Sequence, residues 1–143
     1  MLLAIVRVRG IRGVIPKIKK TFELLKLIQT NHCVLVNESP AIKGMINVIK
    51  DYVAFGPLSQ ETLEMVLTNK GKVGSKMLKT IYKPEEITKL TADAFSGKPL
   101  DEKINRVFCM RPPSKGYKNT KLPWPMGALG KRTEMDTILR RMM

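Results

Sequence analysis

Within the first 58 residues, the spacing of apolar side chains alternates between that of a strand and that of a helix. Residues 2–9, 31–36 and 52–58 are rich in β-branched and other apolar residues, which is typical of strands. Between them, apolar residues recur at near-helical spacing over residues 17–28 and again after Pro40. This β-α-β-α-β order predicts an α+β fold in which a small sheet carries both helices on one face.

The second of these helices has the best-defined start. Ser39 is a favoured N-cap residue, and Pro40 is favoured at the first helical position. The apolar residues that follow are spaced to share one helix face: Ile42, Met45, Ile46 and Ile49. The same spacing in the first helix places one face on Ile18, Phe22, Leu25 and Ile28. We expect both faces to be buried.

The first strand alternates differently on its two sides. One side carries Ala4, Val6 and Val8, and the other carries Ile5, Arg7 and Arg9. This pattern predicts a strand with one apolar face and one face that becomes cationic.

Residues 59–143 contain weaker but readable signals. Helices are expected near 59–70, 84–95 and 134–142, and a strand is expected within 106–110. Residues 71–83 hold four lysines and no acid, and they favour a loop with room for a short strand. We therefore divide the chain into a core domain, 1–58, and a mixed helical and extended C-terminal extension, 59–143.

The charge of the chain indicates an anionic partner. Twenty-six Lys and Arg residues oppose twelve Asp and Glu residues, which gives a formal net charge of +14. Such self-repulsion disfavours the compact state unless a partner neutralises it. The first dense group of cations combines a strand face, a glycine-rich turn and a helix start, so that side chains and backbone amides converge on phosphates. Its members are Arg7, Arg9, Arg12, Lys17, Lys19 and Lys20. A merely solvated basic loop is the alternative.

A second basic segment spans residues 111–132. Its cations are Arg111, Lys115, Lys118, Lys121, Lys131 and Arg132, and they alternate with Tyr117, Trp124 and four prolines. A stretch with so little regular structure is uncommon inside a compact domain, which implies that something external orders it. This composition suits RNA, because cationic side chains can pair with phosphates and aromatic rings can stack on exposed bases. We therefore expect an extended RNA-binding segment that is mobile without RNA. A tail packed on its own core, with Trp124 inside the protein, is the alternative.

Other kinds of site receive little support from the sequence. Cys33, Cys109 and His32 form neither a disulfide framework nor a zinc motif, and adjacent His32 and Cys33 point to opposite faces of their strand. The glycine-containing stretches 71–76 and 127–133 lack the spacing of a phosphate-binding loop, and no carboxylate pair suits acid–base work. We predict no catalytic residue, metal or cofactor. The apolar stretch 1–6 is too short for a signal peptide or a membrane span, so we expect a cytoplasmic protein.

Several segments together resemble the L-thirty family of large-subunit ribosomal proteins, in its longer archaeal form and its eukaryotic counterpart. They are RVRG at 7–10, TFELLKL at 21–27, NHCVLV at 31–36, GMINVIKDYVAFG at 44–56, PPSKGYK at 112–118 and GALGKR followed by ILRRM within 127–142. The resemblance runs through nearly the whole chain in the same order. It implies a β-α-β-α-β core with a three-stranded antiparallel sheet, and it implies that bacterial members end near the equivalent of Leu58.

The resemblance also implies a structural, non-catalytic role in the large ribosomal subunit. The expected partners are the large rRNA, the 5S rRNA nearby and other large-subunit proteins. A free-standing RNA-binding regulator that uses the same basic surface is the alternative function.

Overall fold

The structure is a computed structural model, and it describes residues 2–96 and 103–143. The first five elements follow the expected order: β1 (Leu2–Arg7), α1 (Pro16–Leu24), β2 (His32–Asn37), α2 (Pro40–Ile49) and β3 (Val53–Pro57). The extension adds α3 (Gln60–Lys70), β4 (Lys72–Val73), β5 (Lys76–Met77), α4 (Leu78–Ile81), α5 (Pro84–Phe95), β6 (Val107–Cys109), β7 (Gly130–Lys131) and α6 (Met135–Met142). The α+β prediction is confirmed, and the three helices expected in the extension are α3, α5 and α6.

The main sheet has five strands in the order β6-β2-β1-β3-β7. Strand β1 is central and antiparallel to both β2 and β3, with Ile5 opposite Val34 on one side and Phe55 on the other. The predicted three-stranded antiparallel sheet is therefore present. The extension lengthens it at both edges, because β6 pairs antiparallel with β2 and β7 pairs parallel with β3.

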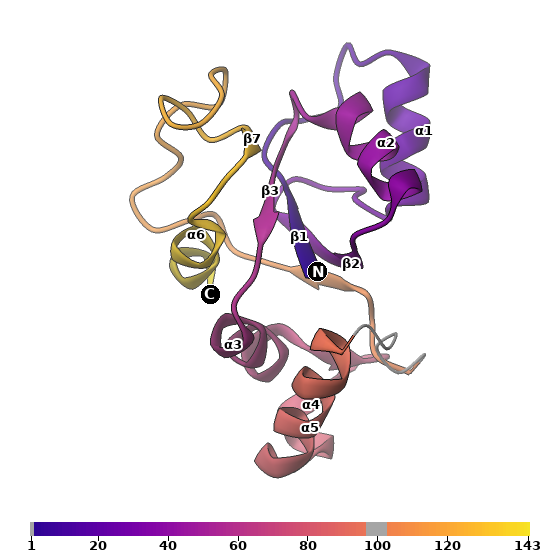
Figure 1. Cartoon of the computed structure of the whole chain (residues 1–143), viewed down its shortest axis with the longest axis vertical. Helices are drawn as coiled ribbons and strands as arrows, with labels where there is room; N and C mark the ends of the chain where they lie inside the picture. The colour runs from indigo at the N-terminus through magenta and orange to yellow at the C-terminus, as the bar shows by residue number, and fades with distance from the viewer. Residues whose placement is uncertain (1, 97–102) are drawn as a thin grey trace.

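Both helices of the first 58 residues cover the same face of the sheet (Figure 1). The start of α2 forms as its sequence predicts: Ser39 accepts a hydrogen bond from the Ile42 amide, and Pro40 is the first helical residue. Ile46 and Ile49 of α2 pack with Phe22 of α1 over Ile5 of the central strand. This layer is one of the two larger hydrophobic clusters of the described residues.

The second cluster lies on the opposite face, where α3 and α6 of the extension pack. Ala4 and Val6 of β1 meet Leu63 of α3 and Leu139 of α6 there. Because helices cover both faces, every residue of β1 is buried. The face that carries Ile5 and Arg7 is covered by α1 and α2, and Arg7 lies over the Phe22 ring. The expectation that this face of the strand becomes cationic is therefore wrong within β1. Whether 1–58 is a domain on its own stays a prediction.

Helix α1 ends four residues earlier than its spacing predicts. The Leu27 amide bonds back to the Phe22 carbonyl oxygen and the Lys26 amide bonds to that of Glu23, which is the Schellman pattern of helix termination. Lys26 occupies the left-handed position with φ 57°. The chain therefore leaves the helix before Ile28, which is 68% exposed, so its assignment to the buried face is wrong.

Replacing Lys26 by glycine is expected to stabilise the protein. A side chain in the left-handed region costs about 1 kcal/mol, and glycine adopts that conformation freely. Urea denaturation followed by circular dichroism should show the free energy of unfolding of Lys26→Gly raised by about 1 kcal/mol. A decrease would mean that the Lys26 side chain makes a stabilising contact that outweighs the strain.

Candidate nucleic-acid interface

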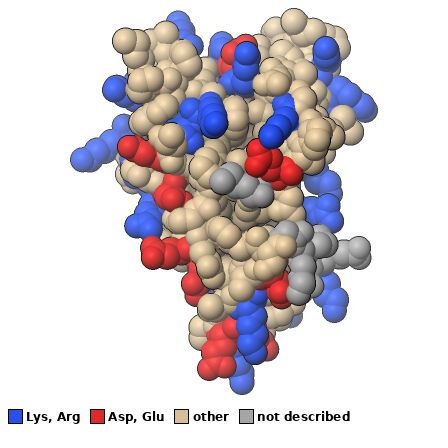
Figure 2. Space-filling view, in the orientation of Figure 1, with Lys and Arg blue, Asp and Glu red and all other residues tan. Residues whose placement is uncertain are grey.

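The two basic segments of the sequence lie at the same end of the sheet. Val8, where β1 passes into the first loop, packs in a small buried cluster with Ala54, Ala128 and Leu129. Tyr117 packs against this cluster. Apolar contact thus joins residues that follow β1 to residues of the 111–132 segment, which we call the C-terminal loop. In Figure 2 the Lys and Arg side chains are frequent around this upper end, and the acidic side chains are more frequent below it.

The backbone of the first loop, residues 8–15, is fixed near each end by a buried side chain. Val8 and Val14 are buried, and the Val8 and Arg9 amides both donate to the Tyr52 carbonyl oxygen. Arg9 is half-buried: its guanidinium lies 5.0 Å from the centre of the Tyr52 ring and donates to the Asp51 carbonyl oxygen at 3.2 Å. Arg12, between these anchors, is exposed.

The N-terminus of α1 follows directly and has neither a side-chain cap nor an acidic residue in its first turn. Lys17, Lys19 and Lys20 are exposed there, and Lys20 forms a surface ion pair with Glu23 at 3.6 Å. The positive end of the helix dipole favours an anion at this position. The positive charges of these lysines repel one another and the positive end of the helix dipole. A phosphate group from a binding partner would relieve this repulsion.

Arg7 does not belong to this surface, contrary to the sequence interpretation. It is 1% exposed. Its guanidinium lies 4.3 Å from the centre of the Phe22 ring and donates to the carbonyl oxygens of Arg9, Leu27 and Ile28 at 2.9, 2.7 and 2.7 Å. Burial lowers the pKa of Arg7. The Arg7 side chain links the end of β1 to the turn that follows α1, so its role is structural and it does not form part of the candidate interface.

The C-terminal loop is fastened to the domain, whereas we expected it to be mobile without RNA. At its start, the Arg111 and Ser114 amides bond to the carbonyl oxygens of Met142 and Arg141 in α6. At its end, the Arg132 amide bonds to the Phe55 carbonyl oxygen of β3. The two prolines follow β6, as expected. The chain then crosses to the opposite edge of the sheet, where β7 pairs with β3. The described structure therefore favours the alternative of a segment packed on its own core, and the mobility of this segment without RNA stays a prediction.

Tyr117 anchors the middle of the C-terminal loop. Its hydroxyl donates to Asn31 Oδ1 at 2.7 Å, and burial raises the pKa of Tyr117 to about 12. Asn31 has a positive φ of 64° just before β2, which presents its side chain to the loop. A ring held this way serves its own fold, so Tyr117 is a structural anchor rather than a stacking platform for a base.

Trp124 at the tip of the C-terminal loop faces Arg132. The guanidinium carbon lies 4.4 Å from the ring centre, and burial lowers the pKa of Arg132. Trp124 is half-buried, so one side of its ring is engaged within the protein. The remaining cations of the loop are exposed: Arg111, Lys115, Lys118, Lys121 and Lys131.

Sequence reasoning missed the residue that clamps this loop. Arg141 of α6 donates to the carbonyl oxygens of Ser114 and Gly116, the latter at 2.9 Å. Its position near a helix C-terminus indicated only a favourable charge for the helix dipole. The clamp joins residues 25 to 27 positions apart, and no local pattern signals such a contact.

The remaining reactive groups have structural surroundings. Cys33 is buried, and burial raises the pKa of its thiol to about 12, which leaves it unreactive. Exposed Cys109 lies across from His32, with Sγ 3.6 Å from Nε2. Among residues 2–96 and 103–143, His, Cys, Asp and Glu nowhere gather in a group of three that would hold a metal ion. In the same residues, every helix is too short or too polar to cross a bilayer.

Comparisons with known proteins agree with this architecture. The family model described as Ribosomal protein L30p/L7e matches residues 3–53. A protein named large ribosomal subunit protein uL30 from Archaeoglobus fulgidus is 35% identical over 151 aligned positions that cover 99% of each chain. Proteins of the same name from Methanocella arvoryzae and Methanococcus vannielii are 38% and 34% identical, over 89% and 100% of this chain. Similarity at this level along the whole chain shows that the protein belongs to the ribosomal protein L30p/L7e family.

Proposed function

We propose that this protein is a structural component of the large ribosomal subunit that holds folded rRNA against the cationic end of its sheet. The observation that carries the proposal is the convergence of two exposed basic segments, residues 9–20 and 111–132, on one small buried cluster. A segment whose backbone is already hydrogen-bonded to its own domain loses less conformational entropy on binding than a free segment does, which favours oriented contact with the RNA backbone.

The contacts would be mainly with phosphates. Lys17 and Lys19 stand at the uncapped start of α1, and Lys115 and Lys118 stand on the anchored C-terminal loop. Three aromatic residues near this surface already have partners within the protein. Arg9 lies over the Tyr52 ring, Arg132 lies over the Trp124 ring, and the Tyr117 hydroxyl donates to Asn31. Because these rings serve the protein, we infer recognition of RNA shape and backbone rather than of splayed bases. The large rRNA is the main partner and the 5S rRNA lies nearby, beside other large-subunit proteins. No catalytic step is involved.

Binding to an rRNA fragment is expected to weaken steeply as salt rises. Each neutralised phosphate releases condensed counterions and contributes a log–log slope of about 0.7–0.9. A protein that makes six to ten such contacts loses about 10³–10⁵ in affinity between 50 and 200 mM salt. Filter binding across this range measures the slope. An affinity that does not change with salt would contradict a phosphate-based interface.

Retention in salt-washed subunits distinguishes a structural component from the alternative, a free-standing regulator. A structural component should sediment with large subunits that have been washed at high salt, because many contacts dissociate together only after the rRNA unfolds. A regulator should be released into the supernatant by the same wash. Quantitative mass spectrometry of the pelleted subunits gives the ratio of the protein to core subunit proteins, which we expect to be one to one.

A further inference from the structure

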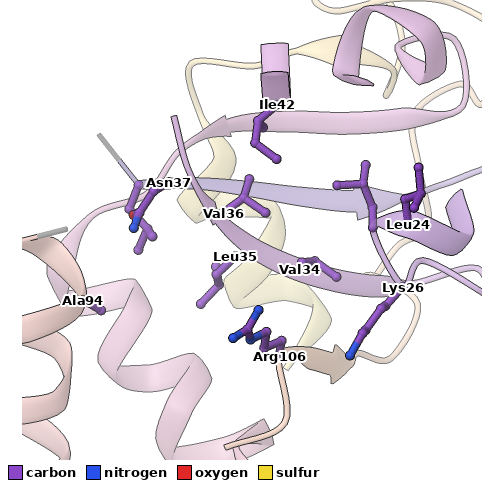
Figure 3. Close-up of a pocket in the computed structure, with 11 residues that line it drawn as sticks. Leu24, Lys26, Val34, Leu35, Val36, Asn37, Ile42, Ala94 and Arg106 are labelled. Carbon is purple, nitrogen blue, oxygen red and sulfur yellow. The ribbon is translucent and has the colours of Figure 1, made fainter. Parts of the chain in front are cut away.

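An apolar groove opens between the end of α1, strand β2 and the edge strand β6. One hollow of about 330 Å³ is lined by Val34 and Val36 of β2, Ile42 of α2 and Leu24 of α1. Figure 3 shows these side chains on three elements around one space. A second hollow, along β6, includes Ile28 and Val107. Lys26 and Arg106 line both hollows, so we treat them as one α1–β2 groove.

The rim of the α1–β2 groove exposes large apolar side chains. Leu24 is 61% exposed and Ile28 is 68% exposed, although both are long aliphatic residues. They flank the turn that ends α1, and each lines one of the two hollows. Exposed apolar residues beside an apolar hollow mark a surface that another molecule covers. Apolar side chains gain no favourable interaction from phosphates, so this groove suits a different partner from the cationic end.

Two cations stand over the α1–β2 groove without an acidic partner in the described part of the chain. Lys26 and Arg106 are both exposed, and neither forms an ion pair with a residue in 2–96 or 103–143. Lys26 holds the left-handed position of the Schellman turn, where glycine is the residue usually found. A long cationic side chain kept at a strained position that points into a groove indicates use of that charge.

We propose that the α1–β2 groove is a docking site for an acidic segment of a neighbouring large-subunit protein, which places a large apolar side chain in the hollow. The apolar floor accepts that side chain, and Lys26 and Arg106 pair with the carboxylates that flank it. This inference rests on the proposed function, because it needs the assembled subunit. It adds a protein partner outside the two basic segments, because no residue of 9–20 or 111–132 lines the groove, so that the domain joins RNA to protein.

Photo-crosslinking in assembled subunits tests the docking site. Benzoylphenylalanine replaces Ile28 at the groove rim in one variant and Lys118 on the C-terminal loop in another. After irradiation of purified large subunits, adducts are treated with ribonuclease or with protease, and crosslinked peptides are sequenced. We expect position 28 to give a ribonuclease-resistant protein adduct with an acidic peptide. Position 118 should give an RNA adduct.

A matched pair of groove variants completes the test. Lys26→Gly and Arg106→Glu are introduced together into each of the two probe variants. The protein adduct from position 28 should fall at least tenfold, whereas the RNA adduct from position 118 and the incorporation of both proteins into subunits should not change. The inference is overturned if position 28 gives an RNA adduct, a basic peptide, an adduct within its own chain or no adduct while position 118 still crosslinks to RNA. Loss of the position 118 adduct and of incorporation would instead overturn the proposed function.

Discussion

Arg7→Ala is expected to lower the free energy of unfolding by about 3 kcal/mol, a large part of the 5–15 kcal/mol that holds a typical domain together. The change removes the donors to three carbonyl oxygens and the cation from the Phe22 ring. A buried carbonyl that loses its partner costs about 1–3 kcal/mol, and the cavity adds to this. Part of the loss is offset, because the guanidinium no longer has to leave water.

Arg9→Ala is the matched control, since Arg9 also contacts a ring and one carbonyl oxygen but is only half-buried. Its unfolding free energy should fall by less than about 1 kcal/mol. Urea denaturation of both variants measures the difference. If Arg7→Ala unfolds like the wild type while its RNA affinity falls, Arg7 would belong to the RNA-binding surface after all.

Lys17→Glu combined with Lys19→Glu is expected to separate RNA binding from stability. Two lost phosphate contacts and two added negative charges should lower the affinity for an rRNA fragment about 100-fold near 0.1 M salt and reduce the salt slope by about two. Stability should stay level or rise, because acids in the first turn of α1 interact favourably with the helix dipole by about 0.3–1 kcal/mol each.

The control carries the same change of charge at the far end of the molecule. Lys79 of α4 and Lys89 of α5 are exposed, and Figure 1 shows these helices at the end opposite the first loop. Lys79→Glu with Lys89→Glu should lower the affinity only a few-fold, through net charge. Equal losses in the two double variants would mean that binding follows total charge and that the cationic end is not a specific surface.

Local signals in the sequence were sufficient for most elements of the fold. Ser39 and Pro40 mark the start of α2 because a side-chain cap and a fixed φ act within one turn. The end of α1 was missed because Lys26, a residue with no turn preference, occupies the left-handed position that glycine usually marks. Position 28 was therefore assigned to a buried face that the helix never reaches.

The errors at the site have a common physical cause, which is contact across long stretches of chain. Arg7 was placed on the surface because alternation shows which residues share a face but not what covers that face. The packing of the C-terminal loop on its own domain has no local signal, because its anchors are distant in sequence: Tyr117 bonds to Asn31, 86 positions away, and Arg141 bonds to Ser114. The exposed lysines of both segments were identified correctly as surface residues, since charge alone keeps them in water.

The central claim is that this chain holds rRNA with the cationic end of its sheet inside the large subunit. Ultraviolet crosslinking of intact, salt-washed large subunits, followed by mass spectrometry of the RNA-linked peptides, tests it most directly. We expect RNA-linked peptides from residues 9–20 and 111–132, with Lys17, Lys19, Lys115 or Lys118 among the modified positions, and none from α3 or α5. A protein lost in the salt wash, or RNA crosslinks confined to α3 and α5, would contradict the account.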